Sequence, residues 1–262
     1  MVRDKVKLRK LIDFISDIGS LQDNDWFIRE LVFKVSDKDA DKVTAHALNE
    51  IHEYCINNII RRQAEGFYSG FVLSKITSQL IEDFVLMERF RREDNFEEFC
   101  FKINQQIEAI IKTIASNDFL QNITEKLNDD AYYFYDNKGG QIINSLGKLI
   151  YMNYDSGNTR IEWNYLQKIK AVLYVFWVKS NHKKEQLIHL KEFNEVLYFP
   201  ARDIYLIRNL NHREGGLTFE TESEGRATNK EKILEILNNK YRKYQQYSGF
   251  LYDFVRTIQN NY

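Results

Sequence analysis

The residue types best suited to chemistry gather in one short stretch, residues 204–216, which reads IYLIRNLNHREGG. If a helix continues through this stretch, Arg208 and His212 lie at positions i and i+4, one turn apart on the same face. An arginine holds a phosphate group through a planar fork that is always charged. A histidine titrates near neutral pH and can move the proton of a ribose 2′-hydroxyl or of the leaving oxygen. Asn209 adds a polar group beside the pair, so the stretch contains the minimum parts for cutting RNA without a metal.

The same residues also fit a structural interpretation. Cationic side chains favour the C-terminal ends of helices because of the helix dipole, and Gly215 with Gly216 is typical of such an end. Arg208, His212 and Arg213 would then cap the last turn and pair with nearby glutamates. The catalytic and the structural interpretations have about equal support from the residues themselves.

Three other patterns invite comparison with chemical motifs. Six residues separate Gly140 from Gly147, whereas a phosphate-binding loop needs four. The segment 182–192 contains two H-x-x-E units, but a di-metal carboxylate bundle needs such motifs on several helices, so a solvated ion-pair face is favoured. His52 and Cys55 could touch one metal, but two ligands do not make a site. The sequence therefore predicts neither a metal nor a cofactor.

The elements that must position these residues are helices. The chain has 262 residues and a single proline, so long helices can continue without interruption. Apolar residues recur at helical spacing and predict helices at these ranges: 8–18, 25–35, 41–65, 73–92, 95–114, around 146–150, 163–178, on both sides of 198–200, and 230–258. Residues 217–229 alternate apolar and polar side chains and predict a short loop or hairpin insertion. The predicted fold is an all-α, multi-helix bundle.

A soft boundary divides the predicted fold near residues 137–140, because the segment 127–141 is rich in Asp, Asn and Gly. This gives an N-terminal helical region, 1–136, and a C-terminal helical domain, 137–262. We expect the first to sense, to dimerise or to restrain the second.

Composition narrows the class of protein. The formal net charge is −1, which argues against coating nucleic acid or membranes through bulk charge. The two cysteines form no C-x-x-C pair, so a reducing cytosol is the default. The N-terminus has no apolar signal core, and the longest apolar run, 171–178, is too short to span a bilayer. We therefore expect a cytoplasmic protein that does not bind membranes.

A second candidate surface lies at 240–247, KYRKYQQY, where basic residues and tyrosines interleave. Such a composition suits a surface that pairs phosphates and stacks bases, with Lys240, Arg242 and Lys243 as weak RNA-binding candidates. The three tyrosines recur every third residue, however, and on a helix they would form one stripe. A half-buried tyrosine stripe under a basic rim is the favoured interpretation.

The stretch at 204–216 resembles the signature of the HEPN ribonucleases, a family of helical domains found in bacterial defence, toxin–antitoxin and RNA-processing proteins. That signature is an Arg, often followed by Asn, and then a His after four to six intervening residues. Arg208 and Asn209 followed by His212 are similar to it, although only three residues intervene. The resemblance covers about residues 159–262.

The resemblance implies a homodimer in which two Arg–His pairs form one composite site. It also implies metal-independent cleavage of single-stranded RNA by attack of the 2′-hydroxyl, in a stress or phage-defence system. Arg208 would stabilise the scissile phosphate, His212 would act as general acid or base, and Asn209 would position one of them. Asn211 and Arg213 would add weaker RNA contacts.

Two alternatives stay open at this point. The short spacing could belong to a tightened helix with an intact site, or to a degenerate domain that only binds RNA or a protein partner. In the second case the chain is a non-catalytic helical adaptor of a defence or toxin–antitoxin system. A regulatory or antitoxin protein, such as a nucleotidyltransferase antitoxin, would then be a partner.

Overall fold

The computed structural model describes most of the chain, in these ranges: 5–19, 26, 45–128, 130–135, 141–151, 154–155, 161–178, 198–212 and 224–262. These residues are mainly helical, so the expected all-α, multi-helix fold is confirmed. Contacts divide the chain into two compact units, residues 1–69 and 70–262.

The first unit is built on two helices that pack against each other, α1 (Lys5–Gly19) and α3 (Ala45–Phe67). They agree with the helices predicted at 8–18 and 41–65, while the one predicted at 25–35 lies outside the described residues except for position 26. The guanidinium of Arg62 on α3 forms an ion pair with Asp17 on α1. This pair links the two helices at their exposed edge.

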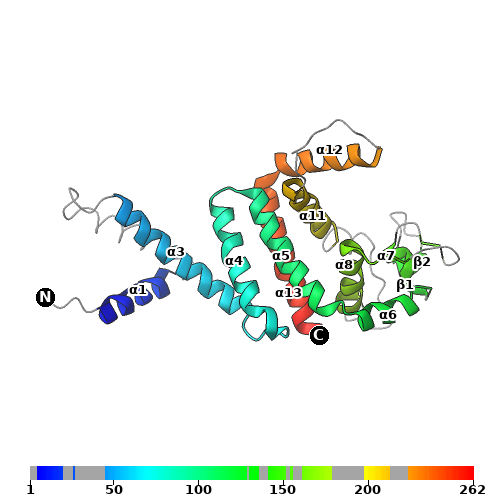
Figure 1. The fold of residues 1–262 in the computed structure, drawn as a ribbon, viewed down its shortest axis with the longest axis horizontal. Helices are drawn as coiled ribbons and strands as arrows, with labels where there is room; N and C mark the ends of the chain where they lie inside the picture. The colour runs from blue at the N-terminus through cyan, green and yellow to red at the C-terminus, as the bar shows by residue number, and fades with distance from the viewer. Residues whose placement is uncertain are drawn as a thin grey trace. The chain divides into compact units, whose positions relative to one another are not determined.

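The second unit contains the following elements in chain order: η1 (Ser74–Ile76), α4 (Thr77–Arg92), α5 (Phe96–Ile114), α6 (Asn117–Glu125), β1 (Asp130–Tyr135), β2 (Gln141–Ser145), α7 (Leu146–Ile150), α8 (Tyr165–Leu173), η2 (Tyr174–Val178), α11 (Phe199–His212), α12 (Glu224–Asn238) and α13 (Lys240–Asn261). Here η1 is a 3₁₀ turn and η2 is a π-helical turn that continues α8. Figure 1 shows these elements along the chain.

Helix α5 lies at the centre of the second unit and contacts α4, α8, α11 and α13 (Figure 1). Its start is set by Asn95, whose side chain accepts a hydrogen bond from the backbone N–H of Glu98. One face of the helix is fully buried, at Phe99, Cys100, Ile103, Ile107 and Ile110. Helix α11, which contains the candidate site, packs against α5.

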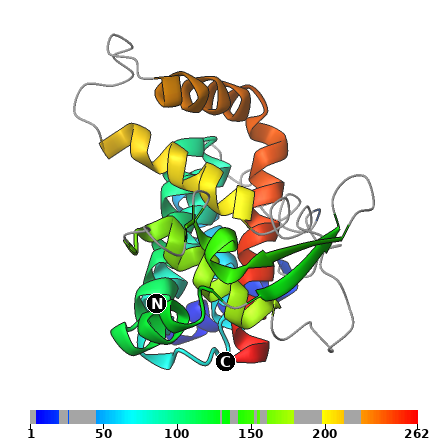
Figure 2. The ribbon, with the colours of Figure 1, turned by 90° about the vertical axis from the view of Figure 1, so that its right-hand side faces the viewer.

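The structure corrects the expected connection over 127–141, because this region contains a β-hairpin. Strands β1 and β2 pair in antiparallel fashion, from Asp130 opposite Ser145 to Tyr135 opposite Gln141 (Figure 2). The run AYYFY consists mostly of aromatic residues with a strong preference for strands. The expected connection is wrong because the strand preference of residues 131–135 outweighs the Asp, Asn and Gly residues of the segment.

The single long helix predicted at 230–258 is two helices, α12 and α13, which are separated by Asn239. The side-chain amide of Asn239 donates a hydrogen bond of 2.8 Å to the backbone carbonyl of Glu235, in the last turn of α12. An asparagine that bonds to nearby backbone in this way competes with helix continuation. The chain turns there, and α12 lies across one end of the unit (Figures 1 and 2).

The loop or hairpin expected at 217–229 is only partly covered by the structure. Residues 217–223 lie outside the described part, and residues 224–229 form the first turns of α12. The loop or hairpin expected over residues 224–229 is therefore wrong, because these residues are helical. Glu224, Arg226 and Ala227 have good helix propensity, which favours the helix.

The compact units divide the chain between Ser69 and Gly70, whereas the sequence indicates a soft boundary near 137–140. Helix α5 belongs to the expected N-terminal region, yet it packs with α11 and α13. The roles expected for 1–136 and 137–262 stay predictions.

Gly147 on α7, which belongs to the segment that was compared with a phosphate-binding loop, has a structural role. Its backbone N–H donates a 2.7 Å hydrogen bond to the carbonyl of Leu127, and the ring of Tyr154 lies against its Cα. A Cβ at this position would lie 2.3 Å from two atoms of that ring. The hydroxyl of Tyr154 is held in turn by Asn128 at 2.6 Å.

We therefore expect Gly147→Ala to lower the free energy of unfolding by about 1–3 kcal/mol through overpacking. The matched control is Gly249→Ala on α13, where an added Cβ meets nothing within 4 Å. This control should raise stability by up to about 1 kcal/mol, because alanine is the better helix former. Urea unfolding of both variants checks the prediction, and equal effects at the two glycines would contradict it.

Candidate functional site

Helix α11 is the element that contains the candidate residues, and it continues without a break from Phe199 to His212. Pro200 stands in its first turn, where a missing N–H costs nothing. Because the helix includes both positions, Arg208 and His212 lie one turn apart, as predicted. The Arg-Asn-x-x-His pattern is therefore held on a rigid element.

The two faces of α11 differ clearly. Ala201, Asp203, Ile204 and Ile207 are buried. The opposite side exposes a half-buried series of larger and polar side chains, which includes Arg202, Tyr205, Arg208 and Asn209. Helix α11 packs against α5, and Arg208 lies close enough to α5 to contact Glu108 on that helix.

Arg208 is held loosely by two neighbours. Its Nη1 donates a hydrogen bond of 3.3 Å to the side-chain oxygen of Asn209. Its Nη2 lies 3.9 Å from a carboxylate oxygen of Glu108 on α5, and both side chains are a little over one quarter exposed. The Nε of Arg208 is buried and has no hydrogen-bond partner in the described structure. The guanidinium is thus oriented, yet part of its donor capacity is unused.

Two tyrosines lie beside this arginine. The rings of Tyr165 on α8 and Tyr205 on α11 are 5.1 Å apart between centroids. Burial, together with the negative charge of Glu108, raises the pKa of Tyr165. Its buried hydroxyl makes no hydrogen bond to the described residues. Tyr165 is therefore a neutral phenol near the Arg208–Glu108 pair.

The remaining predicted residues of this motif are covered only in part. The backbone of Asn211 and His212 is helical, and their side chains lie outside the described structure. Arg213 lies outside the described residues altogether. The structure thus brings Arg208 and Asn209 into contact and fixes the backbone position of His212.

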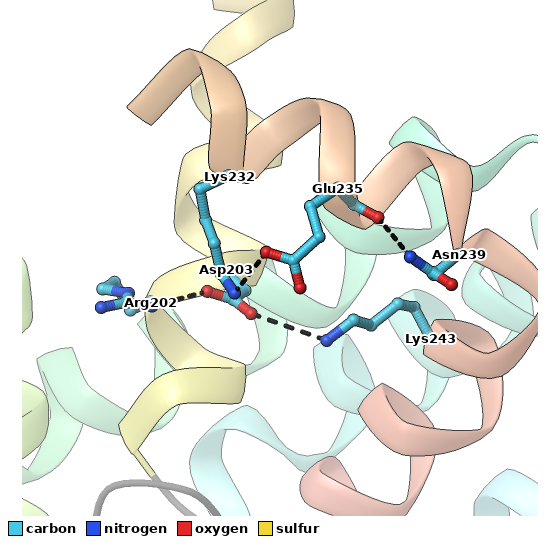
Figure 3. Close-up of polar contacts among 6 residues, drawn as sticks. All are labelled: Arg202, Asp203, Lys232, Glu235, Asn239 and Lys243. Carbon is cyan, nitrogen blue, oxygen red and sulfur yellow. Dashed lines mark hydrogen bonds and ion pairs between the residues drawn. The ribbon is translucent and has the colours of Figure 1, made fainter. Parts of the chain in front are cut away.

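An ion cluster around the buried carboxylate of Asp203 lies near the start of α11, at its contact with α12 and α13 (Figure 3). Asp203 is 3% exposed, and its carboxylate oxygens face two cations. Nη2 of Arg202 lies 3.2 Å from one oxygen, and Nζ of Lys243 lies 3.8 Å from the other. Nearby on α12, Lys232 and Glu235 form a separate pair at 3.1 Å. The cluster ties α11 to α13.

This cluster changes the interpretation of the segment 240–247. Lys243 is occupied by Asp203, and Lys240 forms an ion pair of 2.5 Å with Asp94. Two of the tyrosines, Tyr244 and Tyr247, belong to the core, whereas Tyr241 is 76% exposed. The favoured stripe is thus buried at two of its three positions. Among the three weak RNA-binding candidates, Lys240 and Lys243 have structural partners, and Arg242 is exposed.

The sequence analysis did not identify Lys170, a lysine that lies close to Arg202. Lys170 on α8 donates a hydrogen bond of 3.3 Å to the carbonyl of Ile150, and its Nζ lies 4.4 Å from the ring centroid of Tyr198. Burial and the nearby positive charge of Arg202 lower the pKa of Lys170 to about 8. Nothing in the sequence marks these residues, because they come from separate helices with ordinary composition.

Of the other motifs, only Cys55 can be compared with its structural interpretation. Cys55 is buried in α3, and burial raises the pKa of its thiol, while the side chain of His52 lies outside the described part. Segment 182–192 also lies outside it. In the described ranges, no group of three or more His, Cys, Asp or Glu side chains could hold a metal ion. None of the described helices is both long and apolar enough to cross a membrane.

Comparison with protein-family models, with curated proteins and with solved structures found no match for this chain.

Proposed function

We propose that the protein is a metal-independent endoribonuclease of the HEPN type, a cytoplasmic stress or phage-defence effector that cuts single-stranded RNA by attack of the 2′-hydroxyl. The observation that carries this proposal is the unbroken course of α11 through His212. It gives Arg208, Asn209 and His212 fixed positions on a single rigid helix, although only three residues separate the arginine from the histidine.

Arg208 supplies the charge for the scissile phosphate. Its guanidinium is more than one quarter exposed and is paired to Glu108 only at 3.9 Å. A phosphate that approaches from solvent can replace this loose contact with a bidentate one, which is shorter and stronger. Glu108 would then release part of the guanidinium and continue to orient it.

His212 would move the protons. In the first step a general base takes the proton of the 2′-hydroxyl, the 2′-oxygen bonds to phosphorus, and the bond to the 5′-oxygen breaks. A general acid returns a proton to that leaving oxygen. One histidine can serve in each role if two subunits contribute their pairs, so the proposal includes a homodimer with one composite site. Asn209 positions Arg208 through its 3.3 Å hydrogen bond.

The first test uses the purified full chain with a generic single-stranded RNA in the presence of EDTA. We expect cleavage that EDTA does not affect. The products should end in a 2′,3′-cyclic phosphate or a 3′-phosphate and begin with a 5′-hydroxyl, because the 2′-oxygen is the nucleophile. Products with a free 3′-hydroxyl, or activity that needs an added divalent metal, would contradict the mechanism.

The second candidate function is a non-catalytic adaptor that binds RNA or another protein. The contacts of Arg208 with Glu108 and Asn209 favour it, because an arginine held on both sides can be a structural one. Absence of cleavage combined with tight, stoichiometric binding to a regulatory or antitoxin protein would favour this candidate. In either case the N-terminal helices would sense a signal, dimerise, or restrain the C-terminal domain.

A further inference from the structure

A row of side chains, here called the ridge, lies along the half-exposed face of α11 and ends at the candidate site. Arg202, Tyr205, Asn209 and His212 follow one another at spacings of three and four residues, which places these positions on one side of a helix. Arg202, Tyr205 and Asn209 are half-buried, whereas their neighbours Ala201, Asp203, Ile204 and Ile207 are buried. The ridge is therefore the side of α11 that solvent and ligands can reach.

Aromatic rings and cations alternate along this ridge. Tyr198 precedes the helix, with Nζ of Lys170 at 4.4 Å from its ring centroid. The guanidinium of Arg202 lies 4.6 Å from the ring of Phe199. One turn further, Tyr205 packs against Tyr165. Cations that pair phosphates and aromatic rings that stack bases are the two components of a surface for single-stranded nucleic acid.

The charges near the start of α11 do not balance. Lys170, Arg202 and Lys243 are three cations. Asp203 is the carboxylate shared by Arg202 and Lys243, and Glu235 on α12, which pairs with Lys232, also interacts with Lys243. For Lys170 the described part of the chain shows a carbonyl partner, from Ile150, and no carboxylate. The lowered pKa of Lys170, to about 8, reflects its burial and the repulsion from Arg202. A bound anion would offset this repulsion and raise the pKa of Lys170 toward its ordinary value.

Arg202 also has unused donor capacity. Its Nη2 contacts Asp203, while its Nε is buried and has no hydrogen-bond partner among the described residues. Its side chain is 32% exposed, so part of the guanidinium can meet a ligand. Arg202 and Arg208 are six residues apart, about 9 Å along the helix axis, so they would hold different phosphates.

We propose that the ridge of α11, formed by Arg202, Tyr205 and Asn209 with Lys170 and Tyr198 beside it, is a binding track that leads single-stranded RNA to Arg208 and His212. This inference rests on the proposed function and adds residues that bind the substrate away from the reacting phosphate. Arg202 and Lys170 pair phosphates upstream or downstream of the cut. Tyr205 and Tyr198 stack on unpaired bases, which favours single-stranded RNA.

The test measures RNA binding without cleavage. Full-length protein carrying His212→Ala is titrated, in EDTA, into a 12-nucleotide fluorescent single-stranded RNA, and anisotropy gives Kd at several salt concentrations. Introducing Arg202→Gln should raise Kd about five- to tenfold and reduce the slope of log K against log salt by about 0.7, the value for one lost phosphate contact on a single strand. Arg202→Lys should restore most of the slope, because it keeps the charge.

The matched control is Arg256→Gln, which removes one exposed arginine from α13 and should leave both Kd and slope unchanged. Lys170→Gln is the second variant, in case Arg202→Gln unfolds through its contact with Asp203, and should give the same loss of slope. Circular dichroism confirms that each variant is folded. Equal Kd values and equal slopes for the Arg202, Lys170 and Arg256 variants would overturn the track.

The outcomes distinguish a failure of the proposed binding track from a failure of the proposed nuclease function. If the unmodified chain cleaves RNA but Arg202→Gln changes neither Kd nor KM, the proposed binding track is contradicted and the proposed nuclease function is retained. Binding that depends on Arg202 in a chain that never cleaves RNA supports the track and contradicts the nuclease. Inorganic phosphate or a free nucleotide that competes as well as the RNA does, or a surface that binds only a protein, overturns the track.

Discussion

Replacement of His212 by alanine should lower the rate of RNA cleavage by about two to four orders of magnitude, the contribution typical of general acid–base catalysis. The imidazole is the only group of the Arg208–Asn209–His212 motif that exchanges protons near neutral pH. Its loss therefore removes the proton transfer, while RNA binding through Arg208 is retained. Single-turnover cleavage of a labelled single-stranded RNA measures the rate directly.

The matched control is His46→Ala on α3, which removes an imidazole from the other compact unit. This variant should cleave RNA at the unmodified rate. A small effect of His212→Ala, equal to that of His46→Ala, would assign the activity to another site. A loss of RNA affinity together with the loss of rate would indicate that His212 binds rather than transfers protons.

Replacement of Asp203 by alanine should lower the free energy of unfolding by about 2–3 kcal/mol. Breaking a buried ion pair by removing one partner costs about 3–5 kcal/mol, because the remaining charges are left without compensation. We expect a value at or below the lower end of this range, because Lys243 is 15% exposed and Arg202 is 32% exposed. Water can therefore solvate part of the charge that the variant leaves unpaired. For a unit of this size the loss corresponds to a decrease in Tm of roughly 5–10 °C.

Asp253→Ala provides the control, because this aspartate is exposed on α13. It should change stability by less than about 0.5 kcal/mol, as is usual for surface substitutions. Chemical unfolding of both variants compares them. If Asp203→Ala proved as stable as Asp253→Ala, the ion cluster of Figure 3 would not hold α11 against α13.

The helices could be predicted because their signals are local. The apolar stripe of α5 predicts the element, and in the structure Asn95 is its N-cap. The single proline stands where a first turn tolerates it, in α11. These signals depend on neighbours three or four positions away and need no knowledge of the tertiary fold.

The errors arose where two local signals compete. The strand preference of AYYFY competes with the turn residues beside it, and the helical periodicity of 230–258 competes with the backbone hydrogen bond of Asn239. The outcome depends on packing, which a single sequence does not contain. The β-hairpin and the break between α12 and α13 were missed for this reason.

Some residues of the candidate site could be predicted from the sequence and others could not. The motif at Arg208, Asn209 and His212 is contiguous, so its helical spacing could be read from the sequence. Glu108 and Lys170 could not be identified, because each comes from another helix and meets α11 only through the packing of the unit. Long-range contacts of this kind leave no mark in residue spacing.

The proposed attack of the substrate's 2′-hydroxyl on phosphorus can be tested with one chimeric oligonucleotide. A single-stranded RNA with one preferred cleavage position is compared with the same strand carrying a 2′-deoxynucleotide on the 5′ side of that phosphate, both in EDTA. We expect that cleavage at this phosphate stops while the strand still binds with a similar Kd. Continued cleavage at the deoxy position would mean that water or a metal-bound group is the nucleophile, and would contradict a mechanism that uses the 2′-hydroxyl.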